Sequence, residues 1–197
     1  MVAAWPNIYF EGDTSLKSGL SQFFAELRLL ARRQRCEFHL IAAGDGSRAC
    51  RDFGLALKNH STACNILLMD SEGPLNASAA ADLCKDHGWN HATGAAIFWM
   101  VEMMEAWFHA DKDALEKFYG QGFNRNALKP NPRVEKIAKH DIREGLANAT
   151  RKSKPGNYFD HKTMHGPKLL ELIDPNLVKS ASPQCEKLFA TVLAELG

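Results

Sequence analysis

The apolar run Ile66-Leu67-Leu68-Met69 is the feature that most constrains the fold of this chain. It is too short for a buried helix, and it lacks the apolar and polar alternation of a strand with one face in water. Such a run is typical of a strand that is covered on both faces, as in a parallel sheet between layers of helices. It ends abruptly at Asp70, and a turn-forming Ser-Glu-Gly-Pro follows. The run therefore predicts the α/β class.

Strand and helix signals alternate on either side of this run. Residues 7–10, 38–43 and 95–101 are also strand-like, whereas apolar residues recur at helical spacing in 16–30, 48–58, 77–87 and 102–108. This alternation predicts βαβ units and a mostly parallel sheet flanked by helices. A chain of 197 residues is long enough to bury a substantial core.

The second half of the chain has a different character. Residues 124–132 are polar and turn-forming, and residues 133–162 are rich in Lys, Arg and His. Asp174-Pro175 and Ser182-Pro183 each resemble a helix cap followed by proline at the first helical position. We therefore expect an α/β core over 1–123 and a basic, mainly helical C-terminal appendage over 124–197 that packs on it.

Composition narrows the class of protein. A net charge of +1 excludes proteins that bind nucleic acid through a large overall positive charge, but it allows a local basic groove. The five cysteines are odd in number and lack CxxC spacing, which favours reduced thiols. No apolar run approaches the roughly 20 residues that span a bilayer. These features predict a soluble, cytoplasmic protein without a membrane segment.

Acidic residues follow three of the predicted strands. They are Glu11, the pair Asp70 and Glu72, and the pair Glu102 and Glu105. The carboxyl ends of parallel strands meet at one edge of a sheet, so these side chains should gather there. Gathered carboxylates repel one another unless a cation offsets their charge, and oxygen ligands suit Mg²⁺ or Mn²⁺. Taken singly, each acid is better explained as a helix cap or a solvated side chain than as a metal ligand. Taken together, they predict a metal site.

Two further segments have residues that suit phosphate. Gly46 and Arg48 lie in a Gly-Asp-Gly-Ser-Arg loop that either contacts a phosphate or forms only a tight turn. Lys162 and His165 lie in a basic stretch that also contains Tyr158 and Phe159, a composition that favours phosphates and unstacked bases. Lys162 and His165 either lie near the acidic edge, where either can steady a phosphate, or belong to a basic loop that is simply solvated. An apolar stripe before them is either core or a partner surface: Met100, Met103, Met104, Trp107 and Phe108.

The segments FEGD and LLMDSEG resemble the TOPRIM fold, in which a glutamate follows the first strand and an Asp-x-Asp pair follows a later one. Nearly the whole chain resembles a bacterial family of small TOPRIM-like, OLD-nuclease-like proteins of unknown function, often encoded beside an ABC- or SMC-type ATPase in defence loci. The resemblance also rests on AGDGSRACRDFGLALK, MVEMMEAWFHADKDALEKFYGQGF, KTMHGPKLLELIDP and SPQCEKLF. It implies a metal site at Glu11, Asp70 and Glu72, completed by Glu102 or Glu105. Here the pair is Asp-x-Glu, and the further glutamate that OLD nucleases often carry shortly after the first is absent.

Three functions follow as hypotheses. The first is a Mg²⁺- or Mn²⁺-dependent nuclease, with DNA favoured over RNA, that serves as the effector of an ATPase-containing anti-phage defence system. Its catalytic residues would be Glu11, Asp70, Glu72, Glu105, Lys162 and His165. The second is a non-catalytic subunit that binds nucleic acid or the ATPase. The third, a phosphotransfer or nucleotide-hydrolysing enzyme, is disfavoured because the sequence has no purine-binding signature. The sequence does not decide whether the chain forms a homo-oligomer.

Overall fold

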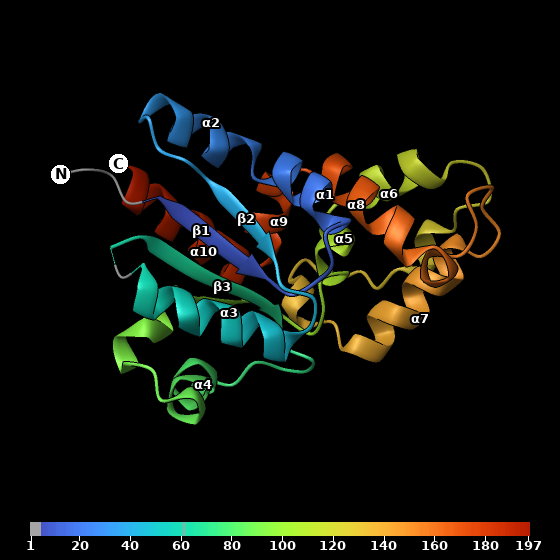
Figure 1. Ribbon diagram of the computed structural model, residues 1–197. Coiled ribbons are helices and arrows are strands. Elements are labelled where there is room, and N and C mark those ends of the chain that lie inside the picture. The colour runs from blue at the N-terminus through green and yellow to red at the C-terminus, as the bar shows by residue number, and fades with distance from the viewer. Residues whose placement is uncertain (1–4, 61) are drawn as a thin grey trace.

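The computed structural model describes residues 5–60 and 62–197, and within them it confirms the α/β class. Strands β1 (Pro6–Phe10), β2 (His39–Ala42), β3 (Cys64–Asp70) and β4 (Ile97–Met100) form one sheet in the order β2-β1-β3-β4 (Figure 1). All described strand pairs are parallel. The expected parallel sheet is therefore present, and its strands end at a common edge.

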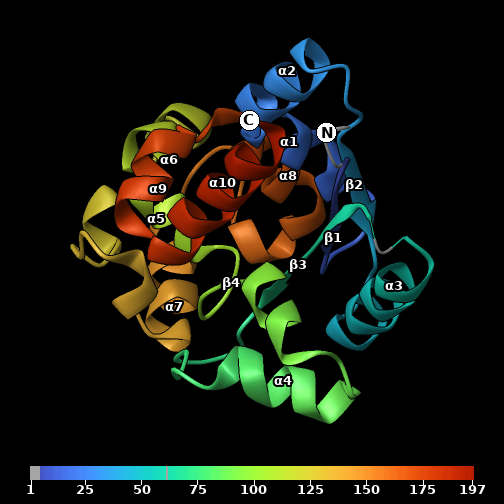
Figure 2. The same ribbon diagram turned by 90° about the vertical axis from the view of Figure 1, so that its left-hand side faces the viewer.

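Helices cover both faces of this sheet (Figures 1 and 2). On one face, α3 (Gly46–Asn59) and α4 (Ala79–His87) pack on Leu67. On the other face, α1 (Leu16–Phe23) and α2 (Ala25–Arg33) pack with the C-terminal helices on Ile66 and Leu68. Neighbouring residues of β3 thus face opposite layers, and all three are fully buried. This arrangement explains why the β3 sequence is apolar without alternation.

The C-terminal half is helical, as expected. After α5 (Ala106–Ala110) and α6 (Lys112–Tyr119) come α7 (Lys139–Thr150), α8 (Lys162–Leu172), α9 (Pro175–Ala181) and α10 (Pro183–Leu196). The side chains of Asp174 and Ser182 cap α9 and α10 by accepting backbone N–H groups two and three residues later, at 2.8 and 3.2 Å. Short 3₁₀ helices lie between the longer elements: η1 (His91–Ala96), η2 (Arg125–Ala127), η3 (Val134–Lys136) and η4 (Tyr158–Asp160).

One apolar cluster joins the two halves of the chain. It contains Leu68 of the sheet and Leu188 of α10, which packs along β4, while α8 lies against α1 (Figure 2). The appendage is thus packed on the sheet, and the proposed division at residue 123 stays a prediction. No helix in the described ranges is long and apolar enough to cross a membrane.

The predicted helix over 16–30 is wrong in one respect, because the helix is broken at Phe24. The Arg28 guanidinium donates to the Ser21 carbonyl at 3.2 Å, which replaces a backbone partner near the break. The bend directs both Phe23 and Phe24 into the core, where their ring centroids lie 5.8 and 5.4 Å from that of Phe189.

The apolar stripe that begins with the last residue of β4 belongs to the core. Met100, Met103, Met104, Trp107 and Phe108 are all buried. The core interpretation is therefore confirmed for these residues, and the alternative of an exposed partner surface is wrong.

The contact between α1 and α8 depends on a glycine. A Cβ at Gly19 would lie 2.4 Å from the Pro167 carbonyl oxygen and 2.7 Å from the Leu170 Cβ. Gly19→Ala should therefore lower the free energy of unfolding by about 1–3 kcal/mol, because overpacking outweighs the better helix propensity of alanine. Urea denaturation measures the change. Gly73→Ala is the control, since a Cβ there meets no described atom within 4 Å. A Gly19→Ala variant as stable as the parent would contradict the close contact.

Candidate functional site

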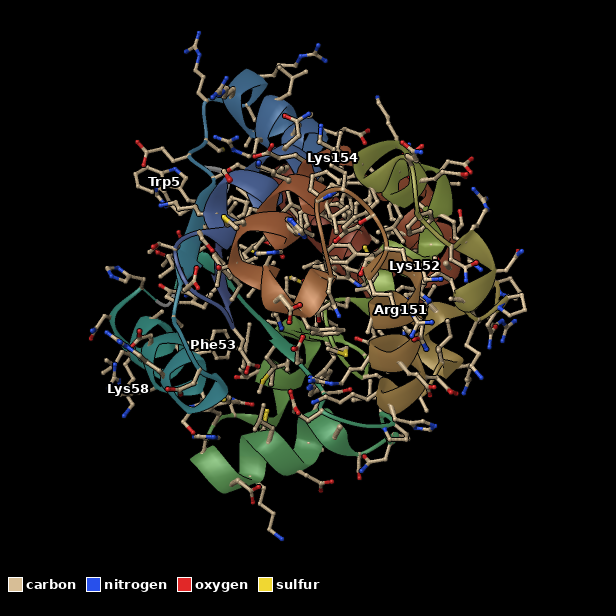
Figure 3. All side chains as sticks on the ribbon, turned by 90° about the vertical axis from the view of Figure 1, so that its right-hand side faces the viewer. Trp5, Phe53, Lys58, Arg151, Lys152 and Lys154 are labelled. Carbon is tan, nitrogen blue, oxygen red and sulfur yellow. The ribbon has the colours of Figure 1, made fainter. Side chains whose placement is uncertain are left out.

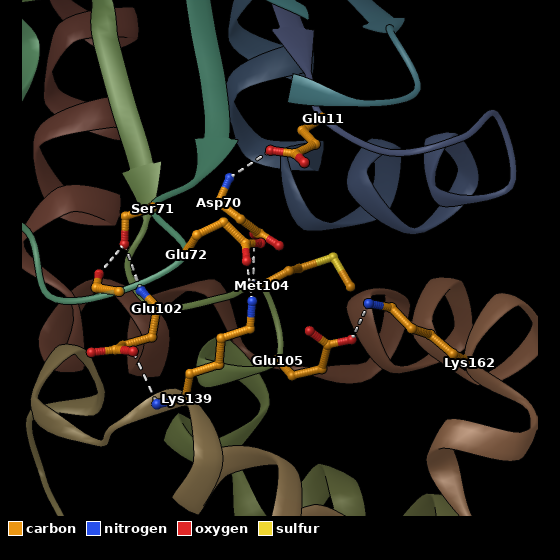
Figure 4. A network of polar contacts seen from close by, with 10 residues as sticks. Glu11, Asp70, Ser71, Glu72, Glu102, Met104, Glu105, Lys139 and Lys162 are labelled. Carbon is orange, nitrogen blue, oxygen red and sulfur yellow. Dashed lines mark hydrogen bonds and ion pairs between the residues drawn. The ribbon is translucent and has the colours of Figure 1, made fainter. Parts of the chain in front are cut away.

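The first two predicted acids lie side by side at the carboxyl edge of the sheet. Because β1 pairs with β3, the Glu11 N–H donates to the Leu68 carbonyl at 2.9 Å. The Glu11 Oε2 then accepts the backbone N–H of Asp70 at 3.1 Å (Figure 4). The parallel register thus brings together two residues that are 59 positions apart in the chain.

Glycines shape the neighbouring edge. Gly12 and Gly44 have φ of +136° and +83°, which favour glycine, and each donates its N–H to the other's carbonyl, at 2.7 and 2.8 Å. A Cβ at Gly46 would lie 3.3 Å from the Glu11 Oε2, so this loop runs directly beside the acid. Asp45 caps α3 by accepting the Arg48 N–H at 2.9 Å. The tight turn is therefore real, and the phosphate-binding role of Gly46 and the exposed Arg48 stays a prediction.

The ends of β3 and β4 are tied together by polar contacts. Ser71 Oγ accepts the Glu102 N–H at 2.7 Å and donates to the Gly73 carbonyl at 2.6 Å. The Asp70 Oδ1 accepts the Met104 N–H at 2.8 Å. Glu72 and Glu102 have φ of +60° and +67°, a strained conformation for residues with a side chain, held by these surrounding contacts.

The carboxylates at this edge disfavour one another's charge. Burial, followed by the charges of Glu105 and Glu11, raises the pKa of Asp70 to about 8, although the Lys162 charge and the Met104 N–H act in the opposite direction. Burial is also the largest cause that raises the pKa of Glu11, where the charges of Glu72 and Asp45 add to it. Four of the five predicted acids are thus close enough to influence one another.

Glu105 is a fully buried acid with an unusual set of partners. Its Oε1 accepts hydrogen bonds from the Tyr158 hydroxyl at 2.7 Å and from the Lys162 ammonium at 2.9 Å. Its Oε2 is also buried, and it has no hydrogen-bond partner within the described part of the chain. A buried carboxylate oxygen without a donor is costly.

Lys139 at the start of α7 contacts the two remaining acids. Its ammonium pairs with Glu72, and its backbone N–H donates to the Glu102 Oε2 at 2.9 Å (Figure 4). The Glu102 carboxylate therefore caps a helix, as one of the simpler explanations for strand-end acids proposes. Its role as a metal ligand stays a prediction.

The basic stretch is only partly directed at the acids. Lys162 reaches Glu105, whereas His165 is buried and its Nδ1 lies 3.1 Å from the Tyr119 hydroxyl. Burial, then the charges of His161 and Lys168, lowers the pKa of His165. Its catalytic role stays a prediction, although its described partners belong to the interior. Tyr158 is fully buried and so does not offer a face to a base. Further exposed cations lie on the turn after α7, where Figure 3 labels Arg151, Lys152 and Lys154, and Lys168 is exposed on α8.

The carboxylates at this edge are of a type that suits a divalent cation, but they do not form a complete coordination shell. No group of three or more His, Cys, Asp or Glu side chains in residues 5–60 and 62–197 is placed to hold a metal as it stands. Glu72 and Glu105 are instead paired with lysines. Mg²⁺ is usually held by one or two carboxylates, with water and substrate phosphate completing its shell. Asp70, Glu11 and Glu105 offer carboxylates of that chemical type, and their role as metal ligands stays a prediction.

Sequence reasoning missed three residues that organise this edge. Ser71 is the middle residue of Asp-x-Glu, Lys139 is one of many lysines in the second half, and Tyr158 was considered only as a surface for bases. The contacts of Tyr158 and Lys139 with the acids span 53 and 67 positions. No local pattern marks such partners.

The raised pKa of Asp70 gives a testable dependence of stability on pH. The folded protein holds this proton up to about pH 8, whereas an ordinary aspartate has a pKa of 3.8, so in metal-free buffer stability falls as pH rises between those values. Asp70→Asn keeps an acceptor for Met104 and should gain stability over the parent across that window. The gain should be at most several kcal/mol, because each pKa unit is worth about 1.4 kcal/mol.

Urea denaturation from pH 4 to 9 in EDTA measures this difference. Asp86→Asn, which removes an exposed carboxylate on α4, is the control. A difference between Asp70→Asn and the parent that does not change with pH would contradict the unfavourable charge at Asp70.

Comparison with known proteins identifies the family of this chain, but it does not assign a biochemical activity. The family described as "Domain of unknown function (DUF4276)" matches residues 11–193, a span that includes every acid of this edge. No curated protein and no solved structure matches the chain. Because the match covers more than half of the sequence, this chain belongs to the DUF4276 family.

Proposed function

We propose that this protein is a Mg²⁺- or Mn²⁺-dependent nuclease that hydrolyses phosphodiester bonds of DNA or RNA at the acidic edge of its sheet. One observation carries the proposal. The carboxylates of Glu11, Asp70 and Glu105 gather at the ends of the strands, and a buried oxygen of Glu105 lacks a donor within the described residues. Such a grouping is costly without a cation. The fold nevertheless holds these carboxylates together, at an edge where the backbone is also strained.

The acids that would hold the ion differ in the contacts that their carboxylates already make. The Glu11 carboxylate accepts the backbone N–H groups of Asp70 and Gly46, and the Asp70 carboxylate accepts that of Met104, so backbone donors fix the position of both acids. Glu105 offers Oε2. Glu72 is half exposed on its pairing with Lys139, so it would join only if that pair opens. A bound ion would polarise the phosphodiester and lower the pKa of a water molecule.

Lys162 would contribute a fixed positive charge beside the ion. Its side chain is 48% exposed, so its ammonium can meet a ligand from solvent while it is held by the buried Glu105. Its charge also reaches Asp70, where it lowers the pKa. In this position Lys162 would contact a non-bridging phosphate oxygen and stabilise the charge that develops there.

The biological setting is inferred from the resemblance alone. The segments shared with small TOPRIM-like proteins, LLMDSEG and MEAWFHAD among them, support a cytoplasmic effector that works with an ABC- or SMC-type ATPase in anti-phage defence. That ATPase would load or license the nuclease on DNA.

A second candidate is a non-catalytic subunit that binds nucleic acid or the ATPase. The observation that favours it is the pairing of Glu72 with Lys139 and of Glu105 with Lys162. These lysines neutralise two acids without a metal, so the edge can be stable in a protein that performs no hydrolysis.

Mn²⁺ binding and cleavage test the first proposal together. We expect the purified protein to bind Mn²⁺, measured by electron paramagnetic resonance of the free ion, and to cleave plasmid, single-stranded DNA or RNA in its presence. Asp70→Asn should weaken Mn²⁺ binding by about 10-fold or more and reduce cleavage to background, because it removes a charged ligand.

Glu171→Gln is the matched control, since it removes one exposed carboxylate on α8, the helix that carries Lys162. It should leave both measurements unchanged. Failure of the parent to bind Mn²⁺, or cleavage that survives in Asp70→Asn, would overturn the proposal. Binding of oligonucleotides without cleavage of any substrate, alone or with the ATPase, would support the non-catalytic subunit.

A further inference from the structure

Tyr158 links the helical appendage to the acidic edge. It lies in η4, far along the chain from β4, and its side chain is fully buried. Its hydroxyl donates to the Glu105 Oε1 at 2.7 Å. Burial, followed by the charge of Glu105, raises the pKa of Tyr158, so the hydroxyl keeps its proton and acts as the donor.

The ring of Tyr158 is itself held on several sides. Its backbone N–H donates to the Thr150 Oγ1 at 2.9 Å, and that hydroxyl donates to the Leu146 carbonyl at 2.8 Å within α7. The ring makes edge contacts with Phe108 of α5 and with Phe159, at centroid distances of 5.8 and 5.0 Å. The hydroxyl therefore has a fixed position relative to Glu105.

The two oxygens of Glu105 are treated differently by their surroundings. Oε1 receives both the Tyr158 hydroxyl and the Lys162 ammonium, whereas Oε2 is buried and has no partner among the described residues. Figure 4 shows Lys162 reaching Glu105 from α8, while the carboxylate lies below Asp70. Donors on one oxygen fix the plane of a carboxylate and leave its other oxygen available in a defined direction.

We propose that Tyr158 is a positioning residue that orients Glu105 so that its Oε2 serves as a ligand of the divalent ion. Tyr158 does not touch the ion or the substrate, and it acts only through Glu105. This inference rests on the proposed metal site, and it assigns to Glu105 a defined ligand atom.

Lys162 cannot replace Tyr158 in this role. Its ammonium reaches Glu105 from a side chain that is 48% exposed, on a flexible stem of four methylene groups. The tyrosine hydroxyl comes from a buried, rigid ring with two rotatable bonds. The orientation of Glu105 therefore depends on the tyrosine, whereas the lysine supplies charge.

Tyr158→Phe tests the inference, because it removes only the hydroxyl. The dissociation constant for Mn²⁺, measured by electron paramagnetic resonance of the free ion, should rise by about 10- to 100-fold, as expected when a partner of a metal ligand is lost. Tyr119→Phe is the matched control. It also removes a buried hydroxyl, which lies 3.1 Å from the His165 Nδ1, and it should leave the Mn²⁺ affinity unchanged.

Thermal unfolding in EDTA shows whether each variant is folded, and affinity is compared only between folded proteins. If Tyr158→Phe does not fold, Thr150→Val tests the same positioning role by another route, since it removes the acceptor of the Tyr158 N–H and so shifts the hydroxyl away from Glu105. A weaker Mn²⁺ affinity in either variant supports the inference.

The two proposals can fail separately. Equal Mn²⁺ affinity in the parent and in folded Tyr158→Phe overturns the role of Tyr158 and leaves the metal site standing. Where only Thr150→Val folds, equal affinity in that variant does the same, because the displaced hydroxyl should have weakened binding. An equal loss of affinity in Tyr119→Phe also overturns it, because the effect would then be general. A parent protein that does not bind Mn²⁺ overturns both.

Discussion

The cost of burying the Glu105 carboxylate is the constraint on which much of the C-terminal half depends. An ionised carboxylate removed from water needs strong partners, and an isolated one is far too costly to keep. Here the hydroxyl of Tyr158 comes from η4 and the ammonium of Lys162 comes from α8, and both meet the same oxygen of Glu105. The path of the chain between α6 and α8 thus places two donors over the edge of the sheet.

The parallel sheet supplies the other half of this arrangement. Since β1 and β3 are neighbours that run in one direction, Glu11 and Asp70 emerge at the same level, and the first accepts the backbone N–H of the second. The positive φ of Glu72 and Glu102 shows that the turns after β3 and β4 are strained where they enter this edge. Strain and charge repulsion concentrated in one place are typical of functional sites, because neither contributes to the stability of the fold.

The sequence predicted the features that depend on local patterns. The covered strand, the alternation of strands and helices and the caps of α9 and α10 each follow from a few adjacent residues, and the structure contains all of them. The position of Glu11 beside Asp70 followed from the direction of the strands. The break at Phe24 was not predictable, because the apolar spacing continues through it and no local residue marks the end of α1. Tyr158 and Lys139 were missed for the same reason, since their partners are set by tertiary packing.

The lysine pairings also bear on how a phosphate could enter. An ammonium group has three N–H donors, and Lys162 uses one of them on Glu105, so its exposed side can serve a phosphate oxygen without releasing the carboxylate. Glu72 differs, because its half-exposed pair with Lys139 lies outside the buried network and is easily exchanged for another partner. A cation that displaced Lys139 from Glu72 would weaken one contact between the start of α7 and the sheet, while the Glu102 cap on the same residue would hold α7 in place. The edge can therefore change the partners of its outer acid without losing the position of its inner ones.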